Sequence, residues 1–180
     1  MSDTNETKEW IKDAVLCLLE NQEYHEISMK QIAEEAHIGR RTLYRYFNTK
    51  DEVMKYVAES LMDNFAQKIL INQASTLEDI SQSYFEFWEE NLSILLLLEK
   101  AHLLYIIENN LGSLMMEVAK KTKFKDKPYP VLTKEEYEMY LYHFYFRIAG
   151  FWKLTLVWCH ESPRKTPKEM SQVMVKVIEG

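Results

Sequence analysis

A helix-start signal that recurs along the chain constrains the fold more than any other feature. At five places a Ser or Thr is followed three residues later by Glu or Gln, and apolar residues at helical spacing come next. In this arrangement each side chain accepts a hydrogen bond from the other residue's backbone N–H, which satisfies two donors that a helix leaves free. The signals therefore predict an all-α protein. The five pairs are Ser28 with Gln31, Thr49 with Glu52, Ser75 with Glu78, Thr133 with Glu136, and Thr166 with Glu169.

The apolar pattern between these signals predicts about nine helices. Only 4 Gly and 4 Pro occur, which leaves few turn-forming residues for an all-β fold. We expect an N-terminal domain at 1–50 that contains a helix-turn-helix motif, a bridging helix at 50–72, and a larger helical domain at 51–180. The predicted helices are 7–22, 29–36, 40–46, 50–72, 76–91, 93–110, 113–123, 134–160 and 167–179.

Charge and targeting signals narrow the class of protein. The formal net charge of −6 argues against a uniformly basic nucleic-acid coat and against an anionic membrane surface as partner. Residues 1–10 hold no apolar signal region, and the longest aliphatic run, Ile94 to Leu98, is too short to cross a bilayer. We expect a cytoplasmic protein in which Cys17 and Cys159 are small buried apolar residues rather than a disulfide.

The segment 28–47 has the spacing of a helix-turn-helix: a capped short helix, a tight turn at 37–39 and a second short helix. Residues 36–50 carry Arg40, Arg41, Arg45 and Lys50 and no acidic residue, a local charge of +4. DNA phosphates and guanine edges are the natural partners of such a cluster. A solvated basic helix face is the alternative, and the coincidence with a two-helix motif favours DNA.

These residues resemble the DNA-binding domain of the TetR/AcrR family of transcriptional regulators over about 7–72. The family's pattern is matched by Ser28 with Ile32-Ala33 and by the run from Thr42 to Lys50. The resemblance implies that one group of side chains faces base edges or nearby backbone and a second group touches phosphate. The first group is Lys30, Arg40, Arg41, Thr42 and Tyr44, and the second is Ser28, Tyr46 and Lys50.

Residues 73–180 contain no catalytic motif, and their histidines are scattered. We therefore expect no enzyme activity, no cofactor and no metal site, and we interpret His143, between Tyr142 and Phe144, as a hydrogen-bonded core residue. The Lys-rich segment 120–127 reads as a solvated loop, with an entrance for anionic ligands as the sharper alternative.

The stretch 137–158 is apolar on almost every side. A helix of this kind has to be buried on every side, so we expect one side in the protein's own core and the other against a second subunit. The resemblance likewise implies a dimer interface formed by the last two helices. The expected interface residues are Tyr145, Ile148, Trp152, Val173 and Val177.

A second aromatic group is expected to line an apolar cavity for a small apolar or aromatic effector, which the family resemblance makes plausible. An ordinary filled core is an equal alternative, because aromatic side chains at helical spacing usually pack against one another. The expected lining residues are Phe65, Tyr84, Trp88, Leu104, Tyr105 and Phe144.

The sequence thus favours a homodimeric transcriptional repressor that binds a palindromic operator in double-stranded DNA and is released by a small-molecule effector. The alternative is a helical dimeric co-regulator that a protein partner controls.

Overall fold

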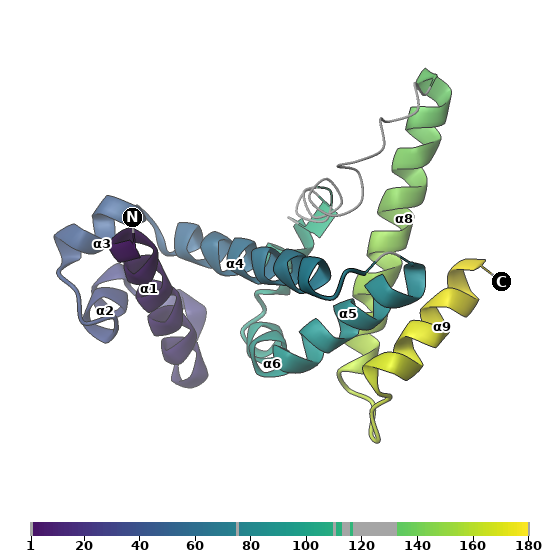
Figure 1. Cartoon of the computed structure of the whole chain (residues 1–180). Coiled ribbons are helices and arrows are strands. Elements are labelled where there is room, and N and C mark those ends of the chain that lie inside the picture. The colour runs from purple at the N-terminus through teal and green to yellow at the C-terminus, as the bar shows by residue number, and fades with distance from the viewer. Residues whose placement is uncertain (1, 75, 110, 113–115, 117–132, 180) are drawn as a thin grey trace. The chain divides into compact units, whose positions relative to one another are not determined.

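The computed structural model describes residues 2–74, 76–109, 111–112, 116 and 133–179. All regular structure in these ranges is helical, which confirms the all-α prediction (Figure 1). None of the helices described there is long and apolar enough to cross a membrane. The elements are α1 (Ser2–Asn21), the 3-10 helix η1 (Tyr24–Glu26), α2 (Met29–Glu35), α3 (Arg40–Tyr46), α4 (Lys50–Ile71), α5 (Leu77–Glu90), α6 (Leu92–Lys100), α8 (Lys134–Trp158) and α9 (Pro167–Glu179).

The predicted helix starts at α2, α8 and α9 carry the expected reciprocal hydrogen bonds. At α9, the Thr166 N–H donates to the Glu169 carboxylate at 2.8 Å and the Glu169 N–H donates to the Thr166 hydroxyl at 3.3 Å. At α4 the Glu52 N–H donates to the Thr49 hydroxyl at 3.2 Å as predicted, whereas the Glu52 carboxylate accepts from the Asn48 N–H. At α5 the reciprocal pair is Thr76 with Asp79, and the predicted start residue Ser75 lies outside the described residues.

The prediction of one helix over 93–110 was wrong, because the structure has two helical segments in this range. α6 ends at Lys100, and helix resumes at residues 104–109. Between them His102 adopts a φ of 58°, a left-handed conformation that an α-helix cannot contain. α1 begins at Ser2, earlier than the predicted start at 7. The predicted helix at 113–123, apart from residue 116, and the predicted loop at 120–127 fall outside the described residues.

The chain divides into two compact units, and the division differs from the predicted boundary at 50. The N-terminal unit comprises Met1–Ser60 with Ser93–Ile107, and the C-terminal unit comprises Leu61–Leu92 with Glu108–Gly180. α4 contributes residues to both units. In the N-terminal unit α1, α2 and α3 enclose a core of aliphatic and aromatic side chains. The buried members include Ile11, Val15, Leu19, Ile32, Ala33, Leu43, Phe47, Val53 and Val57.

The C-terminal unit is built around aromatic side chains from α5 and α8. α5 packs along α9 (Figure 1), and the buried Met170 and Met174 of α9 belong to the same core. Tyr84 of α5 meets Phe151 of α8 edge-to-face with ring centroids 5.1 Å apart. Edge-to-face pairs of this kind add to the stabilisation that burial alone provides. The core also contains Phe65, Phe85, Phe87, Trp88, Trp152 and Trp158.

Two side chains predicted to be buried are exposed. Cys17 lies on the solvent side of α1, whereas Cys159 is buried as expected. A hydrogen bond to Glu35 raises the pKa of the Cys17 thiol, so this cysteine is not activated as a nucleophile. His143 is exposed on α8 rather than packed in a core. Both errors have one physical reason: apolar neighbours in sequence do not fix which way a helix turns a given residue.

Candidate functional site

The turn between α2 and α3 fixes the geometry of the helix-turn-helix. The His37 N–H donates to the Glu34 carbonyl at 3.1 Å, and the Ile38 N–H donates to the Ala33 carbonyl at 2.9 Å. His37 supplies the left-handed backbone of the turn, with a φ of 53°. Gly39 begins α3 in an extended conformation and offers no side-chain cap. These bonds close the C-terminal end of α2 shortly before α3 begins.

α3 has one buried side and one exposed side. Leu43 is buried against α2, whereas Arg40, Arg41 and Tyr44 point away from the core and Tyr44 keeps 51% of its surface accessible. Neither arginine forms an ion pair with any residue that the structure describes. Two cations without acidic partners, presented beside a phenol on a short exposed helix, form a surface suited to phosphates and base edges.

Arg45 and Tyr46 at the end of α3 bind each other. The Arg45 guanidinium donates to the Tyr46 hydroxyl at 2.9 Å and lies over its ring, 4.8 Å from the centroid. This hydrogen bond lowers the pKa of the Tyr46 phenol. The two predicted contact residues therefore act together: the exposed arginine is held by the half-buried tyrosine.

Lys50 is bound within the N-terminal unit. Its Nζ donates to the backbone carbonyls of Tyr24 at 2.6 Å, His25 at 3.2 Å and Ile27 at 2.9 Å. It also lies over the Tyr24 ring, 4.5 Å from the centroid. Three carbonyl acceptors match the three protons of an ammonium group. We call this arrangement the Lys50 clamp, and it competes with the phosphate contact that the resemblance implied.

A phenol completes the attachment of η1 to α4. The Tyr24 hydroxyl donates to the Asp51 carboxylate at 2.6 Å. Burial and this hydrogen bond raise the pKa of Tyr24, so the phenol stays protonated. Together with the Lys50 clamp, the bond fixes η1 against the first turn of α4.

The remaining predicted DNA contacts lie around the same surface. Ser28 is exposed at the start of α2, where its hydroxyl accepts from the Gln31 N–H. Lys30 is exposed and pairs with Glu34 at 3.6 Å, one turn along α2. Thr42 is half-buried on α3. Surface pairs such as Lys30 with Glu34 contribute little to stability, so the lysine can exchange this partner for a phosphate.

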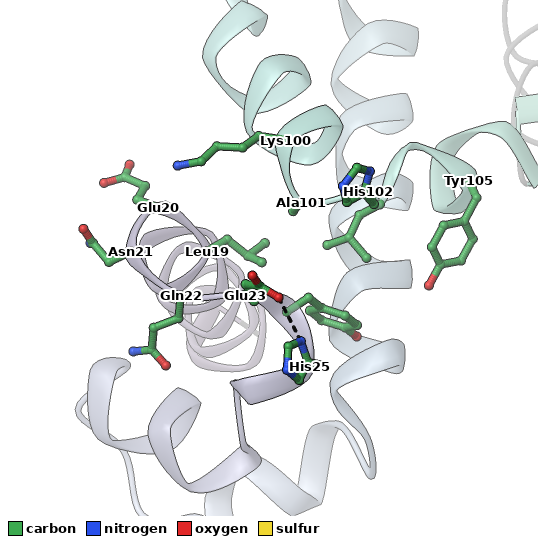
Figure 2. A pocket seen from close by; sticks show the side chains of 12 residues that line it. Leu19, Glu20, Asn21, Gln22, Glu23, His25, Lys100, Ala101, His102 and Tyr105 are labelled. Carbon is green, nitrogen blue, oxygen red and sulfur yellow. Dashed lines mark ion pairs between the residues drawn. The ribbon is translucent and has the colours of Figure 1, made fainter.

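A cavity of about 580 Å³ lies beside η1 inside the N-terminal unit (Figure 2). It is lined by the end of α1, by η1 and by the segment 100–105, and its side chains include Glu23, His25, His102 and Tyr105. Glu23 and His25 form an ion pair at 3.2 Å, drawn as the dashed line in Figure 2. Carboxylates, imidazoles and phenols thus line this cavity together with the apolar side chains of Leu19 and Leu103.

The six residues predicted to line an effector pocket are divided between the two units. Leu104 and Tyr105 belong to the N-terminal unit, and Tyr105 lines the cavity beside η1. Phe144 stacks on Tyr140 along α8. Phe65, Tyr84 and Trp88 share the aromatic core of the C-terminal unit; Phe65 and Tyr84 meet edge-to-face at 5.6 Å. These three side chains thus pack against other aromatic rings of the core, the arrangement described by the alternative of an ordinary filled core.

The residues predicted for the dimer interface differ in exposure. Tyr145 and Val177 are exposed, Ile148 and Val173 are half-buried, and Trp152 is buried against Trp88 in its own unit. Sequence reasoning missed the most exposed apolar side chains of α8, which are Tyr142 at 70% and Phe146 at 80% accessible surface. Large exposed aromatic residues on one helix mark a surface that binds another molecule.

Residues 11–57 match the family model of bacterial regulatory proteins of the tetR family. An HTH-type transcriptional regulator of Staphylococcus aureus (strain USA300) is 31% identical over 94 residues, which cover 52% of this chain and 48% of that protein. An uncharacterized HTH-type transcriptional regulator of Bacillus subtilis, YxbF, is 32% identical over 59 residues, 33% of this chain and 16% of that protein. The chain thus spans half or less of the length of these relatives.

Two solved structures share the fold of the whole chain. The fatty acid degradation regulator FadR from Bacillus halodurans has a TM-score of 0.59 and 18% identity, with 97% of this chain and 95% of that chain covered. The dihydroxyacetone kinase operon activator DhaS has a TM-score of 0.58 and 19% identity, with 96% and 94% covered. At such identities the likeness shows the fold alone.

Proposed function

We propose that this chain, whose residues 11–57 match the model of bacterial regulatory proteins of the tetR family, is a homodimeric transcriptional repressor of that family. It binds a palindromic operator with α3 in the major groove and leaves the operator when a small-molecule effector binds. The observation that carries the proposal is that Arg40 and Arg41 are exposed and form no ion pair with any described residue, on a helix whose opposite side is buried.

We assign the exposed side chains of α3 and α2 either to base edges in the groove or to the phosphate backbone. Arg40, Arg41 and Tyr44 are exposed and extend toward the groove, where a guanidinium can bind guanine through two hydrogen bonds. Arg45, held by Tyr46, is suited to a phosphate at the groove's edge. Lys30 and Ser28 at the start of α2 are suited to the backbone of the same strand.

Dimerisation would use the exposed apolar side of α8 together with α9. Tyr142, Tyr145 and Phe146 are exposed on α8, and Val177 is exposed on α9. A two-fold axis through this surface would pair it with the same surface of a second copy. Such a dimer presents two α3 helices, and a palindromic operator requires them about 34 to 36 Å apart.

Fluorescence anisotropy with a duplex from the chain's own upstream DNA tests DNA binding. Arg40→Ala is expected to weaken binding by about tenfold or more, as the loss of a base or phosphate contact does. Lys55→Ala is the matched control, since Lys55 is exposed on α4 and pairs with Glu59 away from α3. Equal loss in both variants would mean that the protein binds DNA by general charge, and absence of binding to any palindrome would refute the proposal.

A further inference from the structure

The cavity beside η1 carries opposite charges on its two walls (Figure 2). Glu20 and Glu23 lie on the wall formed by the end of α1 and the residues that lead to η1. Lys100 and His102 lie on the wall formed by the segment 100–105. Both walls belong to the N-terminal unit, so this cavity is separate from the aromatic core of the C-terminal unit.

One acidic and one basic side chain at this cavity stay unpaired. Glu23 is already paired with His25 at 3.2 Å. Glu20 and Lys100, by contrast, are exposed and form no ion pair with each other or with any other residue that the structure describes. Both also line an adjoining cavity of about 350 Å³, so they lie at the same end of the larger one. Opposite charges on facing walls that do not reach each other leave room for a molecule that bridges them.

A ligand of a single sign does not match this end of the cavity. A cation attracted by Glu20 would meet the Lys100 ammonium, and an anion attracted by Lys100 would meet the Glu20 carboxylate. A zwitterion places one charge beside each residue, and opposite charges in contact attract even at a solvated surface. The ammonium and the carboxylate of an α-amino acid are attached to one carbon atom, which matches two partners at one end of a cavity.

The floor of the cavity is apolar. Leu19 and Leu103 line it and are only 3% and 2% exposed. Tyr24 and Tyr105 line it as well, and Tyr105 keeps 49% of its surface accessible. Aliphatic and aromatic surface favours an apolar side chain on the ligand, because contact removes apolar area from water. The cavity volume of about 580 Å³ lies in the range of small-molecule sites.

We propose that this cavity binds a free α-amino acid with an apolar or aromatic side chain. The ammonium of the amino acid pairs with Glu20 and its carboxylate pairs with Lys100. Its side chain packs on Leu19 and Leu103. One wall of the cavity includes η1, whose backbone carbonyls bind Lys50, so the bound amino acid contacts the element that the Lys50 clamp holds. Binding itself is independent of DNA, whereas its effect on an operator rests on the proposed function.

NMR titrations of the full chain with three matched probes test the site. L-Phenylalanine carries both charges, 3-phenylpropanoate keeps only the carboxylate, and 2-phenylethylammonium keeps only the ammonium. We expect phenylalanine to bind about fivefold more tightly than either of the others, the upper end of what one exposed ion pair contributes. In Lys100→Met its advantage over 2-phenylethylammonium falls below about twofold, and in Glu20→Gln its advantage over 3-phenylpropanoate does the same. Lys55→Met and Glu59→Gln are the controls, since both residues are exposed on α4, and these variants keep both preferences.

The ¹⁵N–¹H spectra of the unmodified chain locate the site without any variant. Phenylalanine is expected to shift backbone amide signals of residues 19–25 and 100–105. Equal affinity of the three probes, binding of none, unshifted signals in these two segments, or an equal loss of preference in the control variants would overturn the inference and would mean that the facing charges are only a solvated rim. DNA binding without a preference for phenylalanine refutes this inference alone, and the preference without DNA binding refutes the proposed function alone.

Discussion

Replacing Lys50 with Met separates the two roles that the sequence and the structure give this residue. Met keeps most of the aliphatic length and removes the ammonium, so the carbonyls of Tyr24, His25 and Ile27 lose their shared donor. A hydrogen bond from a charged donor contributes about 1.5 to 3 kcal/mol. Lys50 is half-buried and water can reach part of the clamp, so we expect a total loss of about 3 kcal/mol rather than three full contributions.

Thermal unfolding followed by circular dichroism measures this loss. At about 2 to 4 °C for each kcal/mol, the melting temperature should fall by roughly 6 to 12 °C. Lys55→Met is the control and should change it little, because Lys55 makes only an exposed pair with Glu59 at 3.7 Å.

The salt dependence of DNA binding decides which role Lys50 has. Each phosphate contact adds about 0.9 to the slope of log affinity against log salt. If Lys50 is a clamp, Lys50→Met leaves that slope unchanged below its melting temperature, whereas Arg45→Met lowers it by about 0.9. An unchanged melting temperature together with a slope lowered by about 0.9 would refute the clamp and restore the phosphate contact.

Three further predictions concern local features. Ser28→Ala removes the cap of α2 and should cost about 1 kcal/mol in urea unfolding; no loss would mean that Gln31 alone satisfies the helix start. Hydrogen bonds from Thr166 lower the pKa of Glu169 below 4.5, so its stabilisation is present above pH 4.5 and is lost as the pH falls further. Glu169→Gln should therefore flatten the decline of the melting temperature below that pH, and a parallel decline would contradict this. Phe146→Ser should shift the protein from dimer to monomer in sedimentation at micromolar concentration, while Ser162→Ala, away from α8, should not.

The fold was predictable where the deciding interactions are local. The helix starts at Ser28, Thr133 and Thr166 follow from side chains three residues apart, and the sequence shows such pairs directly. The buried side of α3 was predictable for a similar reason, since Leu43 is its one large aliphatic residue between polar neighbours.

The features that sequence reasoning missed depend on contacts between residues far apart in the sequence or on helices whose apolar residues do not mark one side. The partners of Lys50 are carbonyls 23 to 26 residues earlier, in and directly after a three-residue 3-10 helix without a periodic pattern. α8 is apolar on all sides, so its sequence could not show that Trp152 points into the core and Phe146 points out. The break at His102 interrupts an apolar run that reads equally well as one continuous helix.

The contacts within the N-terminal unit bear on the release of DNA by an effector that we propose. The Lys50 clamp and the bond from Tyr24 to Asp51 hold η1 on α4, and the Tyr56 hydroxyl donates to Glu9 of α1 at 2.7 Å. α3 lies in the same unit and is joined to α4 by the three residues 47–49. Here the Phe47 N–H donates to the Leu43 carbonyl and the Asn48 N–H donates to the Glu52 carboxylate, so distorting α3 alone would break hydrogen bonds of this connection. We therefore expect release to change the spacing between two α3 helices and leave each helix intact.

Single half-sites distinguish these two ways of release. If only the spacing changes, a releasing molecule weakens binding to a full palindrome but alters affinity for one half-site by less than about twofold, because the contacts within each half-site persist. Small apolar or aromatic molecules are first screened for weakened binding to the palindrome, and a molecule that weakens it is then titrated against both duplexes by anisotropy. Equal weakening on the half-site and the palindrome would show that the effector distorts α3 itself, and the rigidity inferred from the Lys50 clamp would then be wrong.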